Sequence, residues 1–347
     1  MLWLVHQYFS VTASRWDATS EVKHTGRIAM LNNAGCREFF VGTRRHRRLE
    51  CLFSSCLIAA LMMSPVPVVF AQSAATVSGQ VEGAQPIPAA LGLSGSYGRL
   101  KDDRNGFLGT TRWHQETLSG ETRLGGFQLG LSASHNWSRK ELDEHILTSG
   151  PDAGGRVLGG TTKSRSNAFL ASAGRHFGSV YIGGFIGYGQ GETDEFRQGE
   201  GVTASWERDF HTRTIGVNVS TLLDIGEGWY LAPGAQYIRF KSVSDATVDS
   251  LGNLVDREEN LLVRGRLGGE VGYQTLLGEL VATAGLRPYV VHDFVLFRDY
   301  TDETAADLTG FLTFAGEQFT AGIEVSTELG RKETDSVSGR LFVGVKF

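Results

Sequence analysis

Cysteine is almost absent from the chain, which contains three in 347 residues, and all three lie at or before Cys56. The rest of the sequence therefore has no disulfide framework, no thiol nucleophile and no zinc–thiolate site. It also contains no glycine-rich phosphate loop, no cluster of histidine ligands and no Gly-x-Ser-x-Gly elbow. We therefore expect neither a cofactor nor an enzymatic activity.

Long apolar runs are equally rare. The one at 51–63 follows a run of basic residues and ends before Pro65, so it is too short for a membrane-spanning helix. A basic segment, an apolar segment and small residues at Ala71 or Ala75 are the three parts of a secretory signal. The sequence predicts a cleaved signal peptide over 44–71, with cleavage after Ala75 as an alternative.

This signal divides the chain into four parts. Residues 1–43 are expected to be an extended leader or an over-long start, with Met30 as the alternative first residue. Residues 72–87 are too few for a folded domain and contain glycine and proline, which disfavour a stable helix. We expect them to form a short linker or plug, followed by a single folded domain over 88–347.

Positive charge is deficient in the part that follows the signal peptide. Residues 1–71 hold eight of the 33 Lys and Arg and four of the 38 Asp and Glu, which leaves 25 basic and 34 acidic residues and a net charge of −9. This balance argues against nucleic acid as a partner. Since no second long apolar run follows the signal peptide, a bundle of membrane helices is excluded as well.

The sequence does contain alternation of apolar and polar residues, most clearly at its carboxyl end. Leu341, Val343, Val345 and Phe347 share one face of the segment 337–347, and polar or small residues occupy most of the other. This is the period of a β-strand with one apolar side. A closed barrel in lipid accounts for such a strand at the end of the chain, because its last strand pairs with its first.

The same alternation recurs at 89–98, 127–138, 214–223 and 319–329. A soluble β-sandwich would alternate too. Most of these segments are longer, however, than the five or six residues typical of soluble strands. Strands of about 9–11 residues are needed to cross a bilayer at a tilt, so the pattern favours a transmembrane barrel.

Two kinds of connection alternate along the chain. Tight turns that contain glycine are expected at 124–126, 178–179, 226–228, 277–279 and 315–317, and longer polar segments lie between them. Short turns at one end and long loops at the other are typical of outer-membrane barrels. The sequence therefore predicts an all-β membrane protein, a closed antiparallel up-and-down barrel of about twelve strands. The expected strands are 88–100, 107–123, 127–140, 161–177, 180–195, 203–225, 229–243, 258–276, 280–298, 307–314, 318–330 and 337–347. Alternation is poor in the second and the tenth, so ten strands remain the alternative.

In its second half the chain resembles the translocator barrel of the autotransporter family. The residues that carry the resemblance are Arg264–Tyr273, Leu286–Val290, His292–Phe294 and the closing segment Ser338–Phe347. The resemblance implies a location in the cell outer membrane, in contact with its lipid and lipopolysaccharide. It also implies that the barrel-assembly machinery recognises the terminal strand through the assembly signal Leu341, Val343, Val345 and Phe347.

Members of that family normally carry a long exported passenger between signal and barrel, whereas only 72–87 stand in that place here. We therefore expect an autotransporter-type barrel without a sizeable passenger, acting as a narrow or plugged pore, a translocator or a surface scaffold. Two other functions are open. One is adhesion through acidic external loops, and the other is hydrolysis by an outer-membrane enzyme.

Charged residues on polar strand faces are the candidate functional residues. Arg264, Arg266 and Glu270 share one face of a predicted strand, and Glu324 lies on the polar face of 319–329. These lumen-facing charges would either set ion selectivity and hold a plug or form a solvated cross-strand ladder that fills the interior.

Three other groups of residues have a predicted place. His292 and Asp293 lie near a barrel lip, but adjacent strand residues point to opposite faces, so they cannot form a catalytic dyad. Acidic residues are frequent in and beside the predicted loops, where they either bridge divalent cations to lipopolysaccharide or are simply solvated. The third group is expected in the aromatic belts at the two bilayer interfaces. It comprises Tyr97, Trp113, Phe127, Trp137, Phe177, Tyr188, Trp206, Trp229 and Tyr237.

Overall fold

The computed structural model describes residues 89–103, 108–146, 156–157, 159–199, 202–295, 303–332 and 334–347. All regular elements of these residues are β-strands. No helix in this part of the chain is long and apolar enough to cross a membrane. The leader, signal peptide and linker predicted at 1–43, 44–71 and 72–87 lie outside the described residues.

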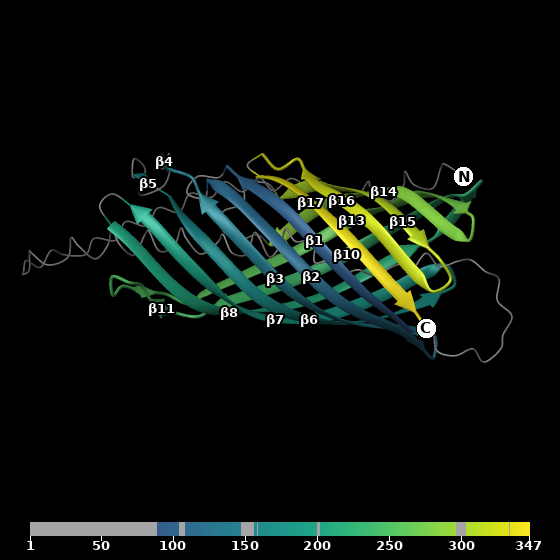
Figure 1. Cartoon of the computed structure of the whole chain (residues 1–347), viewed down its shortest axis with the longest axis horizontal. Coiled ribbons are helices and arrows are strands. Elements are labelled where there is room, and N and C mark those ends of the chain that lie inside the picture. Colours follow the sequence, from purple (N-terminus) through teal and green to yellow (C-terminus); the bar gives the residue numbers. More distant parts are fainter. Residues whose placement is uncertain are drawn as a thin grey trace, which may run out of the picture. The chain divides into compact units, whose positions relative to one another are not determined.

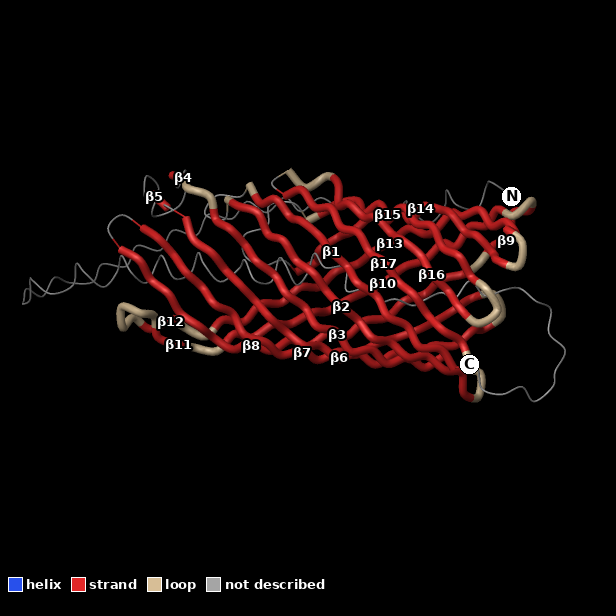
Figure 2. Tube along the Cα trace, viewed as in Figure 1, coloured by secondary structure: helices blue, strands red, loops and turns tan. Residues whose placement is uncertain are grey.

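Long antiparallel strands form one closed ring, and in Figures 1 and 2 they run obliquely to the barrel's long axis. The strands of the ring are β1 (Ala89–Asp102), β2 (Gly109–Leu124), β3 (Phe127–Leu142), β6 (Gly159–Phe177), β7 (Val180–Gly199), β8 (Val202–Thr221), β10 (Trp229–Ser244), β13 (Glu258–Leu277), β14 (Leu280–Val295), β15 (Thr304–Ala315), β16 (Phe319–Leu329) and β17 (Thr334–Lys346). The prediction of twelve strands is confirmed in the described residues, and the ten-strand alternative is wrong. The two weakly alternating segments are β2 and β15.

The ring closes where the two ends of the described chain meet. β1 pairs with β17 from Ala90 opposite Lys346 to Asp102 opposite Thr334. Beyond the last strand residue, the backbone N–H of Phe347 donates to the carbonyl oxygen of Ala89 at 2.9 Å. The first and last strands therefore leave no free backbone edge between them, as lipid requires.

Ala89 and Phe347, the two ends of the described barrel, lie at the end that carries the tight turns, hereafter the turn end. The tight connections at 125–126, 178–179, 227–228, 278–279 and 316–318 join successive strands there. In the β2–β3 turn, Gly125 and Gly126 have φ values of 57° and 80°. Two successive residues with positive φ form the two-residue hairpin turn that matches the twist of its strands, and glycine adopts it without strain.

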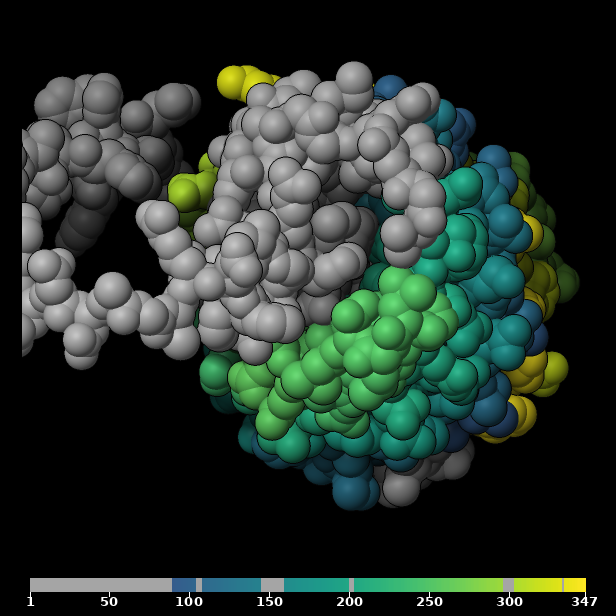
Figure 3. All heavy atoms as spheres, turned by 90° about the vertical axis from the view of Figure 1, so that its left-hand side faces the viewer, coloured from purple at the N-terminus to yellow at the C-terminus, as the bar shows by residue number. Residues whose placement is uncertain are grey.

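Two short hairpins lie at the opposite end, hereafter the loop end. They are β4 (His145–Ile146) with β5 (Arg156–Val157), and β11 (Thr247–Val248) with β12 (Leu254–Val255). The second is tied to β8, because the Ser250 N–H donates to the Ser205 carbonyl at 2.8 Å and the Asp245 N–H to the Asp209 carbonyl at 2.9 Å. Figure 3 views the barrel from this end and shows the hairpin of β11 and β12 in green beside teal strands.

The two faces of the wall have opposite character. Leu131, Leu267 and Phe347 point outward with 69%, 68% and 71% of their surface exposed. Serine, threonine and charged side chains such as Ser96, Thr193 and Glu270 are buried on the inner face. An apolar outside and a polar inside reverse the order of a soluble barrel, and they are the arrangement that a lipid environment selects.

Two of the nine aromatic residues predicted for the interfacial belts face the interior instead. Trp113 is 3% exposed and lies on the inner face of β2. Trp206 shares the inner face of β8 with the buried residues Arg208 and Phe210. The other seven aromatic residues share the outward face of their strands. Because a large ring occupies the polar face of β2, apolar and polar residues do not alternate cleanly there, which explains why this strand was weak in the sequence.

Several acids assigned to the loops are also interior strand residues. Asp102, Glu195, Glu258 and Asp307 lie on inner faces of the strands. Asp102 does so because β1 extends beyond the predicted end at 100, whereas the other three acids lie at the loop-end limits of their predicted strands. In contrast, Asp152, Glu200, Asp299 and Asp302 lie outside the described residues. The predicted strand 203–225 is interrupted at Leu222, after which the short strand β9 (Leu223–Gly226) continues the wall.

Candidate functional site

A line of ion-paired side chains crosses the inner wall from β10 to β17. The Tyr230 hydroxyl donates to Glu270, which also receives a hydrogen bond from Arg287 Nε. Arg287 also contacts a second acid, because its Nη1 lies 2.6 Å from Glu324 Oε1, and Arg340 Nη1 lies 3.3 Å from Glu324 Oε2. We call these five residues the inner belt: Tyr230, Glu270, Arg287, Glu324 and Arg340. It contains two carboxylates and two guanidinium groups, so its formal charge is zero.

Aromatic rings support both arginines of the inner belt, one from a neighbouring strand and one from the same strand. The Arg287 guanidinium carbon lies 4.2 Å from the centre of the Phe311 ring on β15, and that of Arg340 lies 5.2 Å from the ring of Phe342. A guanidinium over an aromatic face is attracted by the ring quadrupole. Each arginine is therefore held between an acid and a ring, and the belt is a fixed feature of the lumen wall.

A second group, the loop-end cluster, consists of Arg264 on β13, Asp293 on β14, Glu328 on β16 and Arg331 in the segment that joins β16 to β17. Arg264 donates two hydrogen bonds, of 2.6 and 2.9 Å, to the carboxylate of Asp293. Arg331 Nη2 lies 2.6 Å from the same carboxylate, and its Nε donates to Glu328. Burial alone would lower the pKa of the Arg331 guanidinium, but the carboxylates of Glu328 and Asp293 outweigh burial and raise it.

Arg266 stands between the inner belt and the loop-end cluster. Its Nη2 lies 2.7 Å from Asp307 Oδ2 on β15, and its guanidinium carbon lies 4.9 Å from the centre of the Tyr289 ring on β14. Arg266 therefore bridges across β14 in the same way that Arg287 bridges across β15.

The wall formed by β7 and β8 carries its own charged group near the loop end. Glu195 lies 2.7 Å from Arg197 and 3.3 Å from Arg208, and Arg208 lies 3.6 Å from Glu258 on β13. On the remaining wall, Lys140 pairs with Asp102 at 3.0 Å, and both side chains are almost completely buried. Paired charges thus line the lumen on several sides.

The structure places all four predicted lumen charges on the inner face: Arg264 in the loop-end cluster, Glu270 and Glu324 in the inner belt, and Arg266 between them. The remaining members, above all Arg287 and Arg340, were not predicted from the sequence. The pairing of Arg264 with Asp293 was predictable from the sequence. The tight turn at 278–279 pairs Leu277 with Leu280, and the register that this turn sets places Arg264 opposite Asp293.

His292 and Asp293 face opposite sides of β14. Asp293 is 2% exposed in the interior, whereas His292 contacts Thr304 through Nδ1 at 2.9 Å and packs edge-on against Phe294 on the outer side. Nor do the described residues contain a group of three His, Cys, Asp or Glu side chains that could hold a metal ion.

The predicted assembly residues share the outward face of the terminal strand. Leu341, Val343 and Val345 are 63%, 47% and 45% exposed. Their side chains make the lipid-facing side of β17, and its inward side carries Arg340 and Phe342.

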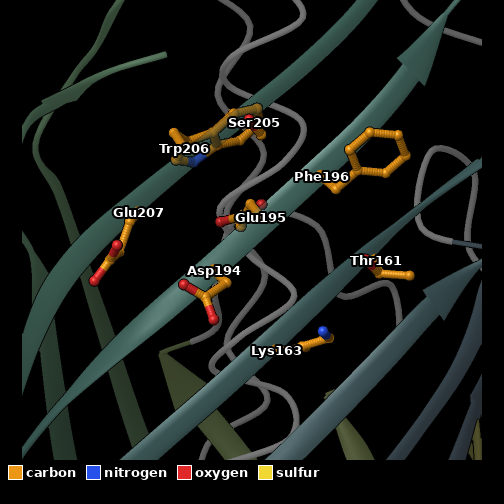
Figure 4. Close-up of a pocket in the computed structure, with 8 residues that line it drawn as sticks. All are labelled: Thr161, Lys163, Asp194, Glu195, Phe196, Ser205, Trp206 and Glu207. Carbon is orange, nitrogen blue, oxygen red and sulfur yellow. The ribbon is translucent and has the colours of Figure 1, made fainter. Parts of the chain in front are cut away.

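A shallow hollow of about 350 Å³ lies in the wall formed by β6, β7 and β8 near the loop end. Most of its lining residues face outward, among them Lys163, Asp194 and Glu207, while Glu195 and Trp206 approach it from the inner face (Figure 4). No pattern in the sequence predicts this hollow.

Comparison with known proteins adds a family to this geometry. A family model described as the autotransporter beta-domain matches residues 93–338. The pertactin autotransporter of Bordetella parapertussis is 27% identical over 245 residues, which cover 58% of this chain and 26% of pertactin. The chain thus spans about a quarter of the length of that relative.

Solved structures show the same fold. The translocator domain of the autotransporter NalP from Neisseria meningitidis is similar with a TM-score of 0.67 and 15% identity, covering 85% of this chain and 99% of that domain. The transport unit of AIDA-I from Escherichia coli has a TM-score of 0.55 at 11% identity and covers 78% of this chain and 94% of that unit. Because the family model covers well over half of the sequence, the chain belongs to the autotransporter beta-domain family and is an outer-membrane β-barrel.

Proposed function

We propose that the barrel acts as a narrow aqueous pore whose lumen can pass ions and an extended polypeptide segment but no folded domain. The inner belt carries this proposal, because it places charged groups on the lumen wall and anchors each of them. Barrels of about eight strands are filled by side chains, whereas those of 16–18 strands leave a wide channel. A ring of twelve strands lies between the two.

The charges of the lumen suit the passage of chain rather than a tightly packed core. The inner belt presents both negative and positive side chains to the lumen: Glu270, Glu324, Arg287 and Arg340. A polypeptide segment of either charge would therefore find side chains of opposite charge there. A core built for stability alone would more often use apolar packing, since a buried ion pair gains little over a hydrophobic isostere. We infer that the barrel has no catalytic activity of its own, which the opposite orientations of His292 and Asp293 support.

The outward face suggests the partners. The terminal strand presents Leu341, Val343, Val345 and Phe347 along one side, which suits recognition by the barrel-assembly machinery before insertion. After insertion the same apolar face is solvated by outer-membrane lipid. Lipopolysaccharide is the expected lipid partner at the end where the long loops lie.

Single-channel recording in planar bilayers tests the pore. The full chain, processed and purified from an outer membrane, is compared with a variant that lacks residues 72–87, the predicted linker or plug. We expect small ion-conducting steps from the full chain and larger steps from the variant. Silent traces from both proteins, after insertion has been verified, would contradict the pore and favour a filled scaffold.

A further inference from the structure

Four basic side chains lie side by side across four consecutive strands of the outer wall. Arg99 on β1 is the register partner of Arg112 on β2, Arg112 is the partner of Arg139 on β3, and Arg139 is the partner of Lys163 on β6. Residues that are direct cross-strand partners share one face of the sheet, and here it is the outward one. At about 4.8 Å between neighbouring strands, the four cations occupy about 15 Å of the surface. We call them the cation row.

Among the described residues, two of the four cations have an acid beside them: Lys163 has its register partner Asp194, and Arg139 has Glu141. Arg139 lies 3.1 Å from Glu141. Within the described part of the chain, no ion pair or side-chain hydrogen bond involves Arg99, Arg112 or Lys163. Like charges directly opposite one another destabilise a sheet. An external anion that bridges neighbouring strands would relieve this repulsion.

The surface beside the row indicates where that anion resides. The next outward-facing row toward the turn end consists of Tyr97, His114 and Trp137. Two outward-facing rows beyond it are Leu93 and Leu118, whose side chains are 57% and 58% exposed. The outer wall thus changes from apolar to aromatic to basic toward the loop end. This is the order of acyl chains, interface and charged headgroups in a lipid leaflet.

We propose that the cation row binds the phosphate groups of lipopolysaccharide in the outer leaflet. Guanidinium groups bind phosphate oxygens in a bidentate manner, so two or three neighbouring arginines can hold a phosphate more firmly than scattered lysines. Chain ends and short turns of such barrels lie on the periplasmic side. The row therefore lies toward the outer leaflet, where this phosphorylated glycolipid resides.

The hollow in Figure 4 continues the proposed site. Lys163 lines it together with Asp194 and Glu207, which follow Lys163 in the same register on β7 and β8. The row therefore changes from positive to negative across the β6–β7 pair. The sugars of a lipid held by the arginines would reach this polar hollow, whereas a phospholipid with a small headgroup would not.

Binding of purified lipopolysaccharide to the full barrel in detergent, freed of native lipid, tests the proposal. The test variant is Arg99→Gln with Arg112→Gln. The control is Arg123→Gln with Arg175→Gln, which removes the same two charges at the turn end. We expect the test variant to bind lipopolysaccharide at least fivefold more weakly than the wild type and the control within twofold. Wild-type binding should weaken by a similar factor when the lipid phosphates are removed.

Stability in lipid-free detergent separates binding from a structural role. Because the substitutions relieve repulsion between like charges, the test variant should unfold at the same denaturant concentration as the wild type or at a higher one. Lipopolysaccharide should then stabilise the wild type more than the variant, because a ligand that binds only the folded state stabilises it. If the double variant does not fold, Arg112→Gln alone serves in its place.

Three results would overturn the proposal. One is equal affinity of the test variant and the wild type for lipopolysaccharide. Another is displacement of the lipid by inorganic phosphate at the same phosphate concentration, which would indicate a site for small anions. The third is a dimer that forms without lipid and is lost in the test variant, which would assign the row to a second copy of the chain. The pore is measured independently, so failure of either proposal leaves the other intact.

Discussion

Trp113 on β2 covers the backbone of Gly98 on β1. A methyl group placed on Gly98 would lie 2.3 Å from Cε2 of the indole. The two residues are register partners on the inner face, so the glycine provides the space that the ring fills. This pairing explains both the inward orientation of Trp113 and the presence of a glycine in the middle of a strand, where glycine is otherwise unfavourable.

Substitution of Gly98 should therefore destabilise the barrel. Gly98→Ala forces the indole to move, and overpacking of this kind costs about 1–3 kcal/mol. The matched control is Gly95→Ala on the same strand, whose added methyl group meets no atom within 4 Å. Urea unfolding of the reconstituted barrel measures both. Equal midpoints for the two variants would show that Trp113 is not held against Gly98.

Glu324 joins the two arginines of the inner belt, so its neutralisation should affect stability. Glu324→Gln leaves Arg287 and Arg340 facing each other with a weaker acceptor between them, and we expect a loss of about 1–3 kcal/mol. The exchange Glu324→Arg with Arg340→Glu should recover part of that loss, because it restores opposite charges at partner positions. If the losses of stability of Glu324→Arg alone and Arg340→Glu alone added up to the loss of the double variant, the two residues would not be coupled.

The inner belt also predicts the ion selectivity of the pore. With two acids and two arginines the belt is neutral, so the wild type should discriminate weakly between cations and anions. Arg287→Gln with Arg340→Gln leaves Glu270 and Glu324, and its reversal potential in a salt gradient should shift toward cation selectivity. The opposite pair, Glu270→Gln with Glu324→Gln, should shift it toward anions. Identical reversal potentials would place the selectivity elsewhere.

Phe347 should matter for assembly more than for the stability of the finished barrel. Its side chain is 71% exposed on the lipid side, so Phe347→Ala removes little packing. If the terminal residue is part of the assembly signal, the folded form should appear more slowly in the outer membrane after a pulse of synthesis. Val337→Ala, on the same face at the other end of β17, should assemble at the wild-type rate. Equal rates for both variants would exclude a special role of the last residue.

Local patterns were sufficient to predict most of the fold. Alternation fixed which side of each strand faces lipid, and glycine-containing turns fixed where strands meet at the turn end. Around such a turn the register follows directly. In the hairpin with its turn at 278–279, Arg264 is opposite Asp293. In the hairpin with its turn at 125–126, Arg112 is opposite Arg139.

Contacts that cross more than one strand were beyond local patterns. The pairing of Arg287 with Glu324 passes over β15, and Arg331 reaches Asp293 from the connection between β16 and β17. Both depend on the curvature of the closed ring and on long connections whose geometry no turn motif sets. The inward orientation of Trp113 likewise depends on its partner Gly98, which a hydropathy pattern along β2 alone does not reveal.

The conductance of an inner-belt variant shows whether the inner belt narrows an aqueous pore. Arg287→Ala with Arg340→Ala shortens the two longest side chains of the belt without changing the strands that carry them. If the belt is the narrow part of an aqueous lumen, single-channel steps of this variant in a planar bilayer should be clearly larger than those of the wild type. The control Arg123→Gln with Arg175→Gln should leave the steps unchanged. Steps of wild-type size from a correctly inserted double-alanine variant would show that the inner belt does not narrow an aqueous lumen.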